Sequence, residues 1–237
     1  MERDHSSHNG KNNLRRIKEV FAVFLFFFPW RVRRWILIKL FSYQIHPTSR
    51  IGIAWVFPKQ LILNKQARIG HLTVCKGLNL LQLGQHATIG RLNWITATPS
   101  KSKIHFSHQK DRRPELILSD HSAITNRHLI DCTNSVIIGK FSTIAGFYSQ
   151  VITHSIDLEH CIQSSSPIKI GDYCFIGTNS VLLGGCALPS YSVLGAKSLL
   201  NKHYSESYYL YMGVPAKPEK SLSSQLSYFL RSRGYVK

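Results

Sequence analysis

Residues 170–200 read IGDYCFIGTNSVLLGGCALPSYSVLGAKSLL, and an aliphatic side chain recurs at every sixth position of this stretch. The aliphatic positions are Ile170, Ile176, Leu182, Leu188, Leu194 and Leu200. Four residues after each of the first five comes a small side chain, at Cys174, Ser180, Cys186, Ser192 and Ser198. A period of six fits neither an α-helix nor a single strand, whose side-chain periods are about 3.6 and about 2 residues. It is typical of hexapeptide β-helix repeats.

Three six-residue edges make one triangular coil of 18 residues, and the apolar–Gly pairs of the chain fit this length. Ile51-Gly52 and Ile69-Gly70 are 18 residues apart, as are Ile176-Gly177 and Leu194-Gly195. Stacked coils lie about 4.8 Å apart, with the aliphatic side chain of each edge pointing inward. Further hexads begin at Leu63, Ile69, Leu83, Ile89, Leu118, Ile124, Ile130, Ile138 and Ile144. We therefore expect an all-β fold whose main domain, residues 45–203, is a parallel β-helix.

The small positions of the repeat predict the roles of three side chains that are otherwise candidates for chemistry. Cys174 and Cys186 occupy these slots, so we interpret them as packing residues and not as nucleophiles. His128 falls on the small inward slot of its hexad and is interpreted as a structural residue. The five cysteines form no C-x-x-C pair, which favours unpaired thiols in a reducing compartment over a disulfide framework or a zinc site.

The repeat is interrupted twice and is flanked by two segments of different character. Residues 97–115 and 153–167 contain no convincing hexad, and loops that leave a regular scaffold are frequent places for functional sites. Residues 1–44 form a basic and aromatic N-terminal segment. Residues 204–237 form a C-terminal tail, in which we expect a short helix at Ser221–Arg233.

The charge balance selects a class of partner. Lys and Arg total 30 and Asp and Glu total 12, which gives a net charge of +18. A field of this sign favours nucleic acid, anionic lipid headgroups or a phosphate-bearing small molecule. No RNP, helix-turn-helix or zinc-finger pattern occurs, so a nucleic-acid partner is not expected.

The N-terminal segment leaves two interpretations open. Basic residues interleave with Phe, Trp, Ile and Leu over residues 14–41. The apolar run at residues 20–28 spans nine residues, whereas a membrane-spanning helix needs about 20, and no signal-peptide cleavage site follows it. An amphipathic helical segment here either lies in a membrane interface or packs on the main domain. We expect a cytoplasmic protein, peripheral on the inner face of the cell membrane in the first case.

Residues 170–220 resemble the end of the hexapeptide-repeat acetyltransferases, in particular the sugar O-acetyltransferases of exopolysaccharide and capsule biosynthesis. Phe175-Ile176-Gly177 stands where that family has W-I-G, and residues 195–202 (GAKSLLNK) stand for G-A-G-S-V-V-T-K. Residues 213–217 (GVPAK) match G-x-P-A-K, and residues 153–157 (THSID) resemble the His-bearing loop of the exopolysaccharide branch. The resemblance implies a left-handed β-helix that assembles as a homotrimer with active sites between subunits.

The resemblance also implies a reaction, in which acetyl-CoA donates its acetyl group to a sugar hydroxyl in surface polysaccharide or glycolipid assembly. His154 matches the catalytic His and would act as general base in direct transfer, without an acyl-enzyme. Asp157 would orient the imidazole or contact the acceptor, and His160 is a weaker candidate for acceptor binding. The positions that match the acetyl-CoA site are Thr178, Ala196, Asn201, Lys202 and Lys217. Lys197 and Asn201 depart from the family pattern, which puts donor affinity and acyl-chain choice in doubt.

Three other functions are alternatives to O-acetyl transfer. Acetylation of an amino-sugar nitrogen would use the same base, and the sequence does not decide between the two acceptors. A non-catalytic, membrane-associated β-helix scaffold is also open. A metal-dependent hydratase on the same solenoid would need three convergent His residues, and the spacing H-x-x-x-x-H that usually supplies two of them is absent, so no metal site is expected.

Overall fold

The computed structural model describes residues 24–100, 102 and 105–236, and the chain divides into two compact units, residues 1–44 and 45–237. In the first unit, the 3₁₀ turn η1 (Leu25–Phe27) precedes the helix α2 (Trp30–Phe41), which starts after Pro29 and ends at Ser42 in the left-handed region. The expected helix of the N-terminal segment is thus present, although residues 14–23 lie outside the described residues. Among the described helices, none is long and apolar enough to cross a bilayer.

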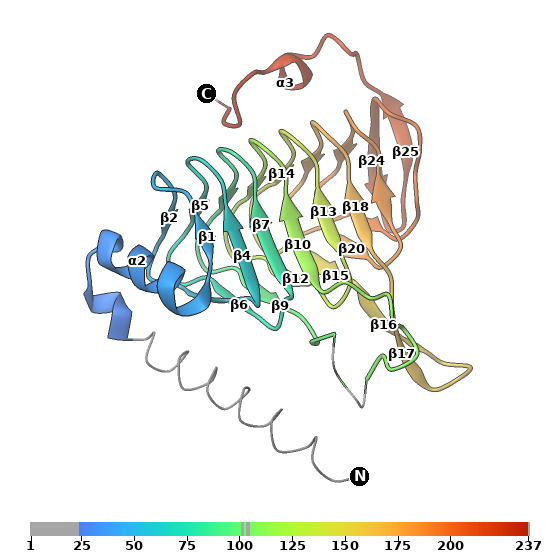
Figure 1. Ribbon diagram of the computed structural model, residues 1–237. Helices are drawn as coiled ribbons and strands as arrows, with labels where there is room; N and C mark the ends of the chain where they lie inside the picture. Colours follow the sequence, from blue (N-terminus) through green and yellow to red (C-terminus); the bar gives the residue numbers. More distant parts are fainter. Residues whose placement is uncertain (1–23, 101, 103–104, 237) are drawn as a thin grey trace. The chain divides into compact units, whose positions relative to one another are not determined.

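The second unit is a β-helix built from three parallel sheets, here called A, B and C (Figure 1). Sheet A contains β1 (Gln44–Ile45), β4 (Gln60–Leu63), β7 (Leu80–Leu83), β10 (Glu115–Leu118), β13 (Val136–Ile138), β18 (Ile168–Ile170) and β21 (Ala187–Leu188). Sheet B contains β2 (Arg50–Ile51), β5 (Arg68–Ile69), β8 (Thr88–Ile89), β11 (Ala123–Ile124), β14 (Thr143–Ile144), β19 (Phe175–Ile176) and β22 (Val193–Leu194). Sheet C contains β3 (Trp55–Phe57), β6 (Val74–Lys76), β9 (Trp94–Thr96), β12 (Leu129–Asp131), β15 (Gln150–Ile152), β20 (Val181–Leu183) and β23 (Leu199–Leu200).

The register of these sheets places the aliphatic residues of the hexads in continuous interior columns. In sheet B, Ile124 pairs with Ile144, and Ile144 pairs with Ile176 on the next coil. All three side chains are at most 1% exposed. The small positions are buried as well, and burial raises the pKa of the Cys174 and Cys186 thiols to about 12. The predicted β-helix and the packing role of both cysteines are therefore confirmed. The coils advance with the left-handed sense (Figure 1).

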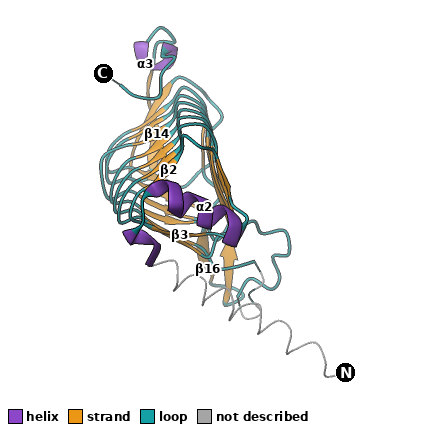
Figure 2. Cartoon of the chain, turned by 60° about the vertical axis from the view of Figure 1, so that its left-hand side comes forward, coloured by secondary structure: helices purple, strands orange, loops and turns teal. Residues whose placement is uncertain are grey.

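Close stacking at the corners explains the glycines of the repeat. A Cβ atom at Gly177 would lie 2.5 Å from the backbone nitrogen of Ala196 on the next coil, so no larger residue fits there. The corners lie directly above one another, as the turns in Figure 2 show. Between sheets A and B the corner positions carry a ladder of stacked rings, with centroids 4.7 to 5.2 Å apart: His86, His121, Phe141, Tyr173, Tyr191 and Tyr208.

The C-terminal residues differ from the expectation of a helix at Ser221–Arg233. β24 (Tyr209–Gly213) extends sheet B by pairing with β22, and β25 (Ala216–Ser221) pairs antiparallel with β24. Helix α3 covers only Ser227–Leu230. The longer helix was wrong because this segment follows the ring ladder. Phe229 packs edge-on against Tyr191 and Tyr208, and the guanidinium of Arg231 lies 5.5 Å from the ring centre of Tyr173.

Candidate active site

The second interruption of the repeat is a β-hairpin that leaves the solenoid between sheets C and A (Figure 1). β16 (His154–Asp157) pairs antiparallel with β17 (Ile162–Ser165), and His154 lies opposite Ser165 at the base of the hairpin. The chain reaches this point directly from β15, so His154 stands two residues beyond the end of a sheet C strand. The hairpin therefore fixes the backbone of His154 against the rigid coils.

The imidazole of His154 contacts the carboxylate of an aspartate on the preceding coil. Its Nδ1 atom lies 2.9 Å from Oδ2 of Asp131 at the end of β12. The His154 side chain is 45% exposed, whereas that of Asp131 is 9% exposed. A carboxylate bound to Nδ1 holds the imidazole in the tautomer whose free Nε2 can accept a proton. The pair thus presents one basic nitrogen to the surface from a fixed orientation.

The environment of Asp131 keeps its carboxylate ionised. Oδ2 accepts hydrogen bonds from the backbone N–H and the hydroxyl of Thr153 at 3.0 and 2.5 Å, and Oδ1 accepts from the hydroxyl of Thr133 at 2.6 Å. Burial alone would raise the pKa of Asp131, but the hydrogen bonds from Thr133, Thr153 and His154 outweigh burial and hold the pKa below its ordinary value. Asp131 therefore remains a negatively charged partner for His154 at neutral pH.

The first interruption of the repeat, residues 97–115, supplies a wall beside His154. The ring of Phe106 meets the imidazole edge-on, with centroids 6.5 Å apart, and Phe106 is itself 5% exposed. The guanidinium of Arg112 lies 4.6 Å from the centre of the Phe106 ring. Arg112 also donates hydrogen bonds to the carbonyls of Thr98, Pro99 and Thr133. This buried arginine holds the Phe106 wall in place against the coils.

One glutamine joins the two interruptions. The side-chain amide of Gln109 donates to the Ser165 carbonyl at 3.0 Å, and its oxygen accepts from the Ser165 backbone N–H at 3.0 Å. The Ser165 hydroxyl donates to the same oxygen at 2.7 Å. Because Ser165 lies on β17 opposite His154, these hydrogen bonds connect the segment that carries Phe106 to the hairpin that carries the imidazole. The two irregular segments form one site, which no repeat pattern could reveal.

Asp157 takes a different place from the one expected. Its carboxylate accepts hydrogen bonds from the backbone N–H groups of Glu159 and His160, and Oδ2 lies 3.0 Å from Nδ1 of His160. These bonds close the tip of the hairpin, so orientation of the imidazole falls to Asp131 and not to Asp157. The hexads that begin at Ile130 could have indicated Asp131, because Ile130 and Val151 pair in register and place residues 131 and 152 side by side. A contact of Asp157 or His160 with an acceptor stays a prediction.

The five expected donor-binding residues fall at two corners of the last coils. Thr178 and Ala196 follow paired strands at the corner between sheets B and C, and both are exposed. Lys217 lies on β25 opposite Met212, whose Cβ stands 2.9 Å from the position of a Cβ on Gly195. Asn201 and Lys202 follow β23, at the corner between sheets C and A that also carries His154. Within one chain, Thr178, Ala196 and Lys217 therefore lie at one end of the sheet C strands, and Asn201 and Lys202 lie at the other end.

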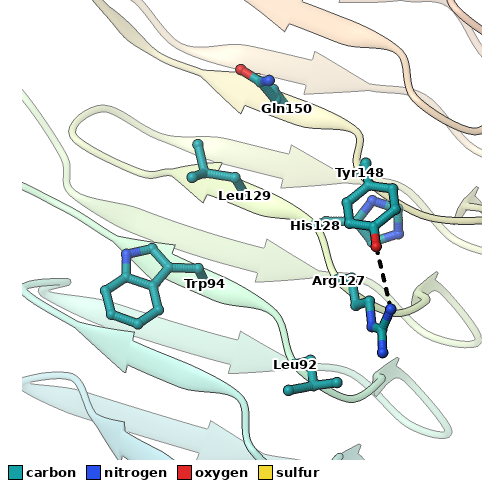
Figure 3. A pocket seen from close by; sticks show the side chains of 7 residues that line it. All are labelled: Leu92, Trp94, Arg127, His128, Leu129, Tyr148 and Gln150. Atoms are coloured by element: carbon teal, nitrogen blue, oxygen red, sulfur yellow. Dashed lines mark hydrogen bonds between the residues drawn. The ribbon is translucent and has the colours of Figure 1, made fainter.

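The outer face of sheet C is hollowed into a shallow groove of about 520 Å³ (Figure 3). The side chains that line it are Leu92, Trp94, Arg127, His128, Leu129, Tyr148 and Gln150. Arg127 donates from Nη1 to the hydroxyl of Tyr148 at 3.2 Å. The groove lies on β12 and β15, the same strands that end at Asp131 and lead to His154.

His128 has the structural role that its slot predicts. The Ser149 N–H donates to Nδ1 at 3.1 Å, and Nε2 lies 2.9 Å from the Thr125 hydroxyl. Burial lowers the pKa of His128 to about 4, although bonds to Gly146 and Ser149 partly oppose this shift. His128 is thus neutral at physiological pH. Within the part of the chain that the structure describes, no three His, Cys, Asp or Glu side chains are grouped to hold a metal ion.

Comparisons with known proteins give matches among solved structures. No protein-family model matches the chain, and no curated protein matches it. A variant of AntD, an N-acyltransferase from Bacillus cereus in complex with dTDP and coenzyme A, superimposes with a TM-score of 0.52 at 13% identity, covering 81% of this chain and 90% of that chain. The acetyltransferase VCA0836 from Vibrio cholerae, in complex with acetyl coenzyme A, gives 0.46 at 19% identity over 89% and 88% of the two chains.

A third match is the polysialic acid O-acetyltransferase OatWY, with a TM-score of 0.42 at 20% identity over 76% of this chain and 84% of that chain. At these sequence identities the similarity concerns the fold alone. The superposition on AntD, with its TM-score of 0.52, supports this assignment. The chain thus has the left-handed β-helix fold of the hexapeptide-repeat acyltransferases.

Proposed function

We propose that this protein transfers an acetyl group from acetyl-CoA to a sugar hydroxyl in the assembly of a surface polysaccharide or glycolipid. The observation that carries the proposal is the exposed imidazole of His154, held through Nδ1 by the buried carboxylate of Asp131. A general base needs this arrangement, with one nitrogen fixed and the other accessible. The fold shared with AntD, solved with coenzyme A, supports a coenzyme A thioester as the donor.

The proposed reaction is a direct displacement. Nε2 of His154 takes the proton of the acceptor hydroxyl while the oxygen attacks the carbonyl carbon of the thioester. The C–S bond then breaks, and the proton on Nε2 passes to the departing thiolate, which restores neutral His154. Asp131 stabilises the imidazolium that exists between these two proton transfers. The Phe106 wall excludes water from one side of the imidazole, which limits hydrolysis of the thioester.

An amine acceptor is the second candidate, because AntD is an N-acyltransferase. Neutral Nε2 would take a proton from an attacking amine in the same manner. Mass spectrometry of the surface polysaccharide with and without the protein would reveal the acetylated sugar. Mild alkali distinguishes the acceptors, because it removes an acetyl ester and leaves an acetamide in place. An unchanged polysaccharide, together with no acetyl-CoA turnover on any sugar, would favour the scaffold function.

The donor site extends the proposal to an assembly of several copies. Ala196 is exposed, and its small side chain leaves the backbone accessible to the cofactor, while the exposed Lys202 and Lys217 provide cations for its phosphates. Thr178, Ala196 and Lys217 lie across sheet C from His154 within one chain. We therefore propose that the donor held at this corner of one copy reaches His154 of another copy in a homotrimer.

The outer face of sheet C is the surface that we assign to this association. Between residues 45 and 153, all exposed large apolar side chains of the described coils lie on sheet C or at its corner with sheet B: Ile53, Leu72, Leu92, Trp94, Leu129, Phe147 and Tyr148. Continuous apolar surface of this kind marks an interface. The groove in Figure 3 is the central part of this face.

Replacing Leu129 with Asp is expected to convert the trimer into monomers, because a carboxylate would be buried between copies. Sedimentation equilibrium would show the change in mass, and acetyl transfer would fall with it. Gln82→Asp on the outer face of sheet A is the matched control. It should leave the mass of the assembly and the rate of acetyl transfer unchanged. A parent protein that is already monomeric and fully active would disprove the shared site.

Replacing Asp131 with Asn is expected to lower kcat roughly 100-fold with little change in KM, since a side-chain amide no longer selects the tautomer with a free Nε2. Steady-state kinetics across a pH series would measure this effect. Asp157→Asn should retain activity within a few-fold of the parent. Equal losses from the two substitutions would show that Asp131 does not act through His154.

A further inference from the structure

The N-terminal half of the chain has a charge distribution unlike the rest. No acidic residue occurs between Glu19 and Asp111, whereas thirteen Lys and Arg residues do. Nine of the twelve acidic residues lie from Asp111 onward. The positive charge of this protein is therefore concentrated in residues 20–110, a stretch of sequence without any carboxylate side chain.

The first three coils of the β-helix present this charge to solvent. Six cations occur between residues 45 and 96, and all six side chains are exposed: Arg50, Lys59, Lys65, Arg68, Lys76 and Arg91. Arg50 and Arg68 are register partners on neighbouring strands of sheet B. Like charges placed directly opposite each other destabilise a sheet unless an anion lies near them. Arg50 and Arg68 therefore form an exposed cationic pair on sheet B, which favours an anionic partner.

The unit formed by residues 1–44 combines cations with exposed aromatic rings. Phe27 is 86% exposed and Trp35 is 62% exposed. Arg31, Trp35 and Lys39 are spaced by four residues on α2, so they share one helix face, and all three are exposed. Large apolar rings in water are unfavourable, and aromatic side chains with an apolar body are favoured at the boundary between headgroups and acyl chains.

We propose that the segment Phe27–Lys39 binds the surface of an anionic phospholipid bilayer, with Phe27 and Trp35 among the headgroups and Arg31 and Lys39 paired with lipid phosphates. The absence of carboxylates from the first three coils adds a long-range attraction of the same sign. α2 is too short to span, so the contact is interfacial. Such binding concentrates the enzyme where lipid-linked sugars are assembled, but it does not depend on the acyltransferase proposal.

Co-sedimentation of the full chain with vesicles tests this inference. We expect binding to phosphatidylcholine vesicles that contain phosphatidylglycerol and little binding to phosphatidylcholine alone. The double substitution Arg31→Gln/Lys39→Gln should lower the partition coefficient about 30-fold, because each cation near the surface contributes about a five-fold factor. Trp35→Ser should also weaken binding, and this loss should persist at high salt, where the charge contribution is screened.

A matched control removes the same charge at the other end of the β-helix. Lys169→Gln/Lys220→Gln changes two exposed lysines that follow Asp111 and should retain most of the binding. Equal losses from both double variants, or equal binding to neutral and anionic vesicles, would overturn the proposal. So would retention on double-stranded DNA with no retention on anionic vesicles, which would assign the charge to nucleic acid. Circular dichroism confirms that each variant is folded.

Discussion

Replacing His154 with Ala is expected to lower kcat for acetyl transfer about 1,000-fold while the protein remains folded. General bases contribute about 10² to 10⁴ in rate, and Ala leaves no group that can take the acceptor proton. The side chain is 45% exposed and contacts the coils mainly through Asp131, so its loss removes little packing. Release of coenzyme A in the presence of the acceptor measures the rate, and an unchanged thermal transition establishes the fold.

His160→Ala provides the matched control for this experiment. His160 lies on the same hairpin, and its ring also contacts a carboxylate, that of Asp157. We expect it to keep kcat within a few-fold of the parent. A His154→Ala protein that is fully active would exclude His154 as the base. If the His154→Ala and His160→Ala proteins were both inactive, activity would depend on the hairpin as a whole and not on His154 alone.

Replacing Ile144 with Ala is expected to lower the free energy of unfolding by about 2 to 5 kcal/mol. Ile144 is fully buried in the middle of the sheet B column, between Ile124 and Ile176. Neighbouring coils are hydrogen-bonded to each other on both sides and cannot close the cavity without breaking register. Urea denaturation followed by circular dichroism measures the change.

Ile156→Ala removes the same atoms from the hairpin, where the side chain is 63% exposed. We expect a change within about 0.5 kcal/mol for this variant. Similar losses at the two positions would mean that the interior columns of the β-helix do not determine its stability.

The fold could be predicted from the sequence because each coil repeats one local rule. An aliphatic residue every six positions fills the interior, as Ile170, Ile176 and Leu182 do, and the register of the sheets follows from that spacing. The buried cysteines and His128 could be predicted for the same reason. At the C-terminus the rule no longer applies, and contacts of Phe229 and Arg231 with the ring ladder determined the conformation instead.

The candidate site was predicted only in part. The position of His154 followed from the break in the repeat and from the resemblance of the residues around it. Its partner Asp131 lies 23 residues earlier in the chain, and pairing of β12 with β15 brings the two together. Phe106, Gln109 and Arg112 lie in a segment without any period, so sequence spacing holds no information about what they contact.

The hydrogen bonds between the Gln109 side-chain amide and Ser165 link the diversification of residues 97–115 to that of residues 153–167. These two interruptions of the repeat cannot be exchanged separately. If only one came from another protein, the buried backbone groups of Ser165 or the amide of Gln109 would lose their hydrogen-bond partners. A chimera that imports one interruption alone would lose the geometry around the imidazole, whereas one that imports both would keep it. New acceptor preferences in chains of this design would then arise by paired replacement, with the coils beneath left unaltered.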